Sequence, residues 1–209
     1  MSYSDKQMQI LTTAEGLFST KGFDGTSVRD IAEEAGVNIA MISYYFGSKE
    51  KLMEALFEQR TSDVKFRIET LLQDESITPL QKIESIVDDY IERVMEKQNF
   101  FKIMICEQVI NKNPAIIHLI YDLKKRNTEE INRLVKDGQE KGAFKKNIDV
   151  MLVLNTVIGN ITQMMITMDY YREFHGLQAV PEDQFCEQIK QKLSEHIKVL
   201  IKVLISNEA

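Results

Sequence analysis

The chain has 209 residues, 44% hydrophobic and 28% charged, with a formal net charge of −6 at pH 7. This length allows one or two domains with a sizeable core. No apolar stretch approaches about 18 residues, and the first residues lack a basic and then apolar pattern, so neither a membrane span nor a signal peptide is predicted. Two widely separated cysteines, Cys106 and Cys186, are expected to be free thiols in a reducing cytoplasm.

Low contents of proline and glycine favour long helices, since only 3 prolines and 9 glycines occur in the whole chain. Hydrophobic periodicity predicts about nine helices and no strand of useful length, so the fold class is all-α. The first helix is predicted at residues 4–20, where apolar side chains recur at helical spacing.

Residues 26–46 predict a helix-turn-helix, the unit that places one short helix in the major groove of DNA. Ile31 and Ala32 belong to the buried stripe of its first helix. Gly36 stands where the turn needs a positive φ, and Asn38 is a good N-cap for the second helix.

The outward face of the second helix of this pair predicts the DNA contacts. An asparagine can bond two atoms of adenine, and a small or branched apolar side chain can touch a thymine methyl group. The residues expected to face the groove are Asn38, Ile39, Ala40, Ser43 and Tyr44. Phosphate contacts are expected from Thr26, Ser27, Tyr45 and Lys49. Core packing is the alternative for the two tyrosines, and a solvated surface position is the alternative for the lysine.

Over about the first 55 residues the chain resembles the tetracycline-repressor (TetR) family of bacterial transcriptional regulators. The matching residues are Ala14, Phe18, Gly22-Phe23, Thr26-Ser27, Ile31-Ala32, Ala35-Gly36-Val37, Tyr44-Tyr45-Phe46 and Ser48-Lys49-Glu50-Lys51-Leu52. Two positions depart from the pattern: many relatives have Gly at the place of Ala40 and Tyr at the place of Ser43. The second departure bears on any contact inferred for position 43.

The resemblance implies two domains, a helix-turn-helix domain at residues 1–47 and a helical ligand-binding and dimerisation domain at residues 48–209. Further helices are predicted at residues 48–72, 78–97, 99–110, 113–142, 149–171 and 182–206, with a loop at 173–181. Thr78-Pro79 and Asn113-Pro114 are cap-then-proline signals that begin two of these helices.

The last two predicted helices are too apolar to be surface helices of a monomer. In the family this pair forms a four-helix dimer interface, and the resemblance implies a homodimer here. Its two recognition helices would lie about 34–36 Å apart and match a palindromic operator. The predicted interface residues are Val157, Ile161, Met164, Met168, Ile189, Leu193, Ile197, Leu200 and Leu204. The alternative is a bundle core within one chain.

Large and adaptable side chains in the second domain indicate a ligand pocket, although plain core packing is the alternative. The predicted ligand-binding residues are Tyr90, Met95, Phe101, Met104, Glu107, Tyr121, Asn155 and Met165. Glu107 could meet a cationic ligand, or it could be paired within the protein. Asn155 could orient a ligand or bond across a dimer.

The family resemblance implies a transcriptional repressor that binds double-stranded operator DNA as a dimer. A small-molecule inducer would displace the predicted fourth helix and release the DNA. Two alternatives remain: a member without an inducer that acts through a protein partner, and a helical dimer that serves as a scaffold. Residues 1–52 carry five basic and seven acidic side chains, which predicts modest DNA affinity and a shallow salt dependence unless two protomers bind together.

Enzymatic function is not expected, because the three histidines lack metal-ligand spacing and no glycine-rich phosphate loop occurs. No metal and no cofactor is predicted for the same reasons.

Overall fold

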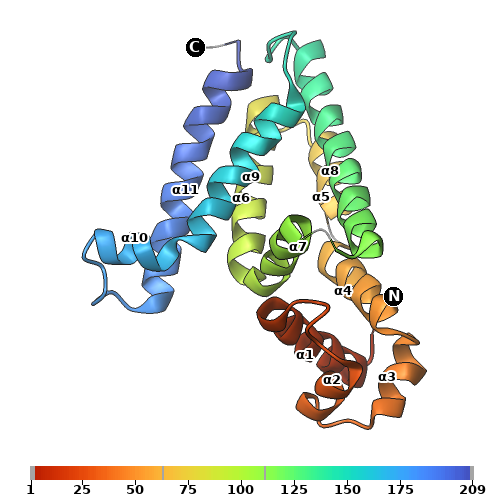
Figure 1. Ribbon diagram of the computed structural model, residues 1–209. Coiled ribbons are helices and arrows are strands. Elements are labelled where there is room, and N and C mark those ends of the chain that lie inside the picture. Colours follow the sequence, from red (N-terminus) through yellow and green to blue (C-terminus); the bar gives the residue numbers. More distant parts are fainter. Residues whose placement is uncertain (1–2, 63, 111, 208–209) are drawn as a thin grey trace. The chain divides into compact units, whose positions relative to one another are not determined.

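The computed structural model describes residues 3–62, 64–110 and 112–207, which form eleven α-helices and no strand (Figure 1). The predicted all-α fold is confirmed. The helices are α1 (Asp5–Lys21), α2 (Val28–Glu34), α3 (Ile39–Phe46), α4 (Lys49–Thr61), α5 (Val64–Gln73), α6 (Pro79–Glu96), α7 (Gln98–Ile110), α8 (Pro114–Glu140), α9 (Val150–Ile166), α10 (Met168–Phe174) and α11 (Glu182–Ile205).

Two predicted helices are each replaced by a pair. The helix predicted at 48–72 becomes α4 and α5, with residue 63 between them outside the described residues. The helix predicted at 149–171 becomes α9 and α10, whose axes bend by 70°. At this bend the Thr167 hydroxyl donates a hydrogen bond to the carbonyl of Gln163, 2.8 Å away. Such bonding of a Thr side chain to the preceding turn favours bent helices.

The chain forms two compact units, each assembled from two separate segments. The first unit comprises Met1–Val64 and Asn99–Lys125, and the second comprises Lys65–Gln98 and Arg126–Ala209. The predicted domain boundary between residues 47 and 48 stays a prediction.

Side-chain caps begin the helices of the first unit. Ser4 and Gln7 form a capping box at α1, and Ser27 and Asp30 form another at α2. Such reciprocal bonds satisfy backbone N–H groups that have no partner inside the helix. Ser48 caps α4 by accepting a hydrogen bond from the N–H of Lys51.

The core of the first unit joins the amino-terminal helices to α7 and the start of α8. The ring of Phe57 on α4 meets the ring of Phe100 on α7, with centroids 5.0 Å apart. Buried members of this core include Ile10, Leu11, Phe18, Phe23, Ile31, Ile42, Leu52, Leu56, Ile103, Ile116 and Ile120. The helix-turn-helix therefore shares one core with helices that follow it by more than 40 positions in the sequence.

In the second unit α6, α9 and α11 pack on one another. Thr78 and Gln81 form the capping box of α6, and Pro79 occupies its first turn as the sequence predicts. Buried side chains at helical spacing face this core, namely Ile83, Val87, Ile91, Val94, Ile161, Ile189, Leu193, Ile197 and Ile201. Lys190 on α11 pairs with Glu92 on α6 at 2.9 Å.

The end of α11 is tied to the loop between α8 and α9. Phe144 and Ser206 form an isolated antiparallel bridge, and the N–H of Asn207 donates to the carbonyl of Ala143 at 3.0 Å. The Phe144 ring lies against Gly138 on α8, so close that a Cβ atom at this glycine would stand 2.1 Å from the ring. Only glycine fits at this approach.

Among the described residues no single helix has the length and apolar composition of a membrane span. The bent pair α9 and α10 passes that test only when its two helices are taken together.

Candidate nucleic-acid interface

A short, well-capped turn joins α2 to α3. Gly36 has a φ of +59°, as predicted, and the N–H of Val37 donates to the carbonyl of Ala32 at 2.9 Å. The side-chain oxygen of Asn38 accepts a hydrogen bond from the N–H of Ala40 at 2.8 Å and caps α3. These bonds fix the direction in which α3 leaves the turn.

One face of α3 is exposed and the opposite face is buried. Tyr44 is 84% exposed and Ile39 is 45% exposed, whereas Ile42 is 1% exposed. Asn38, Ala40 and Ser43 are also exposed. The five residues predicted to face outward are all exposed, and their contact with DNA stays a prediction.

Asn38 and Tyr45 have partners within the protein. Because the Asn38 oxygen caps α3, its NH₂ group is the part of the amide that remains for a base or phosphate. Tyr45 is half-buried, and its ring lies edge-on to the rings of Tyr44 and Phe46, with centroid distances of 5.3 and 6.3 Å. These ring contacts hold Tyr45 beside the exposed face.

Thr26 and Lys49 hold the loop between α1 and α2. The Thr26 side chain is buried, and its hydroxyl donates to the carbonyl of Gly22 at 2.8 Å. The Lys49 ammonium donates to the carbonyls of Phe23 and Thr26, at 2.8 and 2.9 Å, and lies 4.1 Å from the centre of the Phe23 ring. The expectation that the Thr26 side chain faces a phosphate is corrected, because burial turns it into the loop.

Sequence reasoning missed this role of Lys49, since its partners lie 23 and 26 positions earlier in the chain. Lys51, two positions later, instead forms an exposed pair with Glu54 at 2.6 Å. Near the start of α2, hydrogen bonds from the hydroxyl and backbone of Ser27 lower the pKa of Asp30. The carboxylate therefore stays charged at a helix N-terminus, where negative charge is favourable.

The predicted ligand-binding residues divide between the two units. Phe101, Met104, Glu107 and Tyr121 belong to the first unit, and Tyr90, Met95, Asn155 and Met165 belong to the second. Met95 and Met165 are buried, and burial raises the pKa of Tyr90 to about 12. Tyr121 and Asn155 are exposed. The Glu107 carboxylate is buried and accepts a hydrogen bond from the backbone N–H of Phe23.

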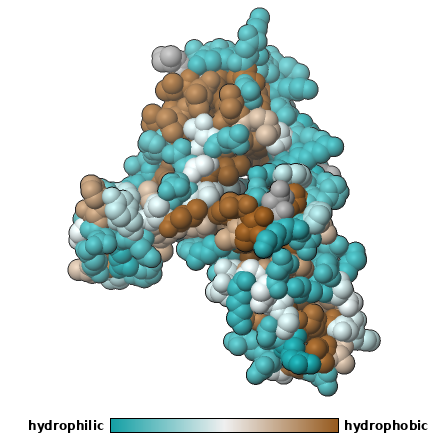
Figure 2. All heavy atoms as spheres, viewed as in Figure 1, coloured by the Kyte–Doolittle hydropathy of each residue, from teal (hydrophilic) through white to brown (hydrophobic). Residues whose placement is uncertain are grey.

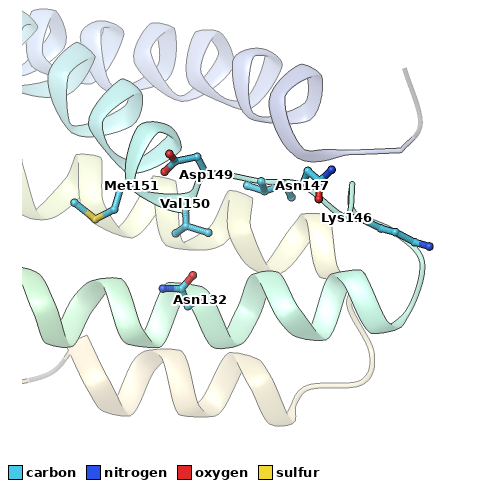
Figure 3. Close-up of a pocket in the computed structure, with 7 residues that line it drawn as sticks. Asn132, Lys146, Asn147, Asp149, Val150 and Met151 are labelled. Carbon is cyan, nitrogen blue, oxygen red and sulfur yellow. The ribbon is translucent and has the colours of Figure 1, made fainter.

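An open surface pocket of about 640 Å³ lies in the second unit, where α8, the following loop and the start of α9 meet (Figure 3). It is lined by Asn132, Lys146, Asn147, Ile148, Asp149, Val150 and Met151. No predicted ligand-binding residue lines this pocket. Within the described part of the chain, no group of three or more His, Cys, Asp or Glu side chains is placed to hold a metal ion.

Most of the predicted dimer residues face the core of their own chain. Val157, Ile161, Met168, Ile189, Leu193 and Ile197 are buried, Met164 and Leu200 are half-buried, and Leu204 is exposed. These six side chains are largely buried in their own chain, so Met164, Leu200 and Leu204 are the members of the predicted set that keep substantial exposed surface, and the interface itself stays a prediction. A helix that is apolar on two sides can turn either side inward, and periodicity does not say which.

Apolar side chains on the other side of these helices remain exposed. Leu152 and Ile166 on α9 are 64% and 56% exposed, and Val199 and Val203 on α11 are each 64% exposed. Figure 2 shows hydrophobic side chains gathered where α9 and α11 lie. We define these four residues as the outer apolar face.

Comparison with known proteins identifies the amino-terminal helices. The sequence model of the family described as "Bacterial regulatory proteins, tetR family" matches residues 10–56. The chain carries a TetR-family domain. This confirms the resemblance predicted from the sequence, and the matched range covers α2, α3 and most of α1 and α4.

One relative by sequence is named as a regulator. The probable HTH-type transcriptional regulator YttP of Bacillus subtilis (strain 168) is 43% identical over 74 residues, which span 35% of this chain and 36% of YttP.

Solved structures share the whole fold. The structure of the ketosteroid transcriptional regulator KstR2 of Mycobacterium tuberculosis has a TM-score of 0.72 at 21% identity, covering 99% of this chain and 98% of that one. The transcriptional regulator FadR from Bacillus subtilis, in complex with stearoyl-CoA, has a TM-score of 0.66 at 20% identity, with 91% and 96% covered.

Proposed function

We propose that this protein is a sequence-specific DNA-binding transcriptional regulator, most simply a repressor. This proposal rests mainly on the exposed face of α3. Tyr44, Ile39, Asn38 and Ser43 stand out from a capped helix whose opposite face is buried, on a TetR-family domain. Such a face can donate and accept hydrogen bonds and touch methyl groups in a major groove. Ser27 and Tyr45, beside it, would contact phosphates.

The proposed regulator is a two-fold homodimer that pairs through the outer apolar face. Large exposed apolar patches are unusual on monomers and typically mark interaction sites. A two-fold axis brings the same surface of both copies together, so one self-complementary face suffices. The two copies of α3 would then read the two halves of a palindromic operator.

Release by a small molecule is the further part of this proposal. The FadR structure contains stearoyl-CoA, so molecules with a long acyl chain are the chemical class to test first. Among the predicted ligand residues, Met95 and Met165 offer buried, adaptable side chains for such a chain. To move the protein from 1:99 to 99:1 between its two conformations, the ligand needs about 5.5 kcal/mol of preference for the released form.

The test is selection of bound sequences from random duplex DNA, followed by titration of the selected duplex at two salt concentrations. A palindromic consensus bound by a dimer is expected. Replacing Tyr44 and Asn38 together by Ala should weaken binding at least about tenfold, since base contacts discriminate by about 1–3 kcal/mol each. Tyr170→Ala is the matched control, because Tyr170 is an exposed tyrosine of the second unit.

Two outcomes favour the alternatives. A folded dimer that enriches no sequence would point to a scaffold. A dimer that binds its operator but gains no thermal stability from stearoyl-CoA or other long-chain ligands would favour regulation through a protein partner.

A further inference from the structure

The buried carboxylate of Glu107 joins α7 to the loop that precedes the helix-turn-helix. The side chain is 6% exposed, and its Oε1 accepts a hydrogen bond from the backbone N–H of Phe23 at 3.1 Å. These two residues are 84 positions apart in the sequence and lie in the same compact unit. A buried N–H group needs an acceptor, so this bond fixes where the loop meets α7.

Phe23 is held on three sides. Its N–H bonds to Glu107, its carbonyl accepts from the Lys49 ammonium, and its ring packs on the Phe18 ring with centroids 5.4 Å apart. The same ammonium lies over the Phe23 ring. α7, the loop after α1 and the start of α4 therefore meet at one residue.

From Phe23 the chain leads directly into α2. The Thr26 carbonyl accepts a hydrogen bond from the same Lys49 ammonium, and the Thr26 N–H donates to the Phe23 carbonyl at 3.3 Å. The next residue, Ser27, is the N-cap of α2. α2 in turn packs on α3. A displacement of Phe23 would therefore move the start of α2 and, through it, the exposed face of α3.

We infer that Glu107 is a positioning residue that couples α7 to the recognition helix through Phe23. This inference rests on the proposed function and gives it a second route of transmission beside α4. A change in α7 would reach α2 through the carboxylate and the loop. Because the Glu107 carboxylate accepts the hydrogen bond from the backbone N–H of Phe23, we assign it the role of connecting α7 to this loop.

Four forms of the full-length protein test the inference: wild type, Glu107→Leu, Glu107→Gln and Glu15→Leu. Leucine removes the acceptor and keeps an apolar volume, whereas glutamine keeps an oxygen that can accept the bond. Glu15 is the matched control, since it is 5% exposed in the same unit and its carboxylate accepts from Arg60 on α4, with Nε 3.0 Å from Oε2.

Two measurements are made well below the unfolding transition of each variant. The first is amide hydrogen exchange in peptides that cover residues 22–27, and the second is affinity for the selected operator. Glu107→Leu is expected to exchange these amides at least about tenfold faster and to bind the operator about tenfold more weakly, because a buried donor loses its partner. Glu107→Gln and Glu15→Leu should each stay within about threefold of wild type in both measurements.

Unchanged exchange over residues 22–27 in Glu107→Leu would overturn the inference, as would an equal increase in Glu15→Leu. Faster exchange with unchanged operator affinity would also overturn it, because the loop would then move without affecting DNA binding. If the wild type selects no operator, the proposed function fails, and the exchange comparison still decides whether Glu107 positions the loop.

Discussion

Replacing Lys49 by Met tests whether its ammonium holds the loop between α1 and α2. The ammonium makes two hydrogen bonds to backbone carbonyls and one contact with an aromatic ring. A hydrogen bond to a charged group contributes about 1.5–3 kcal/mol, and a cation–π contact contributes about 0.5–1 kcal/mol at exposed sites. Lys49 is half-buried, so solvent screens part of this sum.

We expect Lys49→Met to lower the free energy of unfolding by about 2 kcal/mol. The carbonyl of Phe23 keeps its hydrogen bond from the N–H of Thr26, so the loss falls mainly on the carbonyl of Thr26. Lys51→Met is the matched control. This variant removes the ammonium of Lys51, which also lies on α4. The Lys51 side chain is 65% exposed and pairs with Glu54 at the surface, so the free energy of unfolding should change by no more than about 0.5 kcal/mol.

The assay is urea-induced unfolding followed by circular dichroism, with all variants at one protein concentration because the unfolding of the proposed dimer would depend on concentration. A loss below about 0.5 kcal/mol in Lys49→Met, or an equal loss in Lys51→Met, would refute the structural role. DNA binding separates this role from a phosphate contact. If Lys49 contacts one phosphate in each half-site, Lys49→Met should make the slope of log affinity against log salt concentration shallower by about 1.8. If Lys49 is purely structural, the variant should leave that slope unchanged.

Three further outcomes are expected. Hydrogen bonds from Ser27 hold the pKa of Asp30 below its ordinary value of 3.8, so the capping box should stabilise α2 above pH 3.8 and lose this effect as the pH falls through the lowered pKa. In thermal melts, the stability of Ser27→Ala should therefore depend less on acid pH than that of the wild type. Val203→Glu on the outer apolar face should shift sedimentation from dimer to monomer, and an unchanged dimer would exclude this face as the interface. Gly138→Ala should lower the unfolding free energy by about 1–3 kcal/mol, because its Cβ would collide with the buried ring of Phe144; an unchanged urea midpoint would contradict that packing.

Local signals in the sequence predicted the helix-turn-helix well. The cap at Asn38, the positive φ at Gly36 and the buried stripe with Ile31 are all present. Each depends on residues within a few positions, where side-chain caps and helical periodicity decide the structure. The start of α6 at Pro79 follows from the same kind of signal.

Contacts between distant segments could not be predicted in this way. The bond between Glu107 and Phe23 depends on how α7 packs, and no spacing in the sequence encodes it. The same holds for α9 and α11, which are apolar on more than one side. Ile161 and Ile197 face inward, whereas Val199, two positions along α11 from Ile197, faces out. Hydrophobic periodicity predicts the apolar stripes of these helices, and tertiary packing determines which stripe is buried.

The discontinuous units also constrain the order in which the protein can be completed during synthesis. The helices of the TetR-family domain leave the ribosome before α7 and α8, yet their core includes Phe100 and Ile116. Until those residues emerge, Phe57 lacks the aromatic ring against which it packs. A fragment that ends after α4 would expose this apolar surface, so isolated amino-terminal domains should aggregate where the full chain does not.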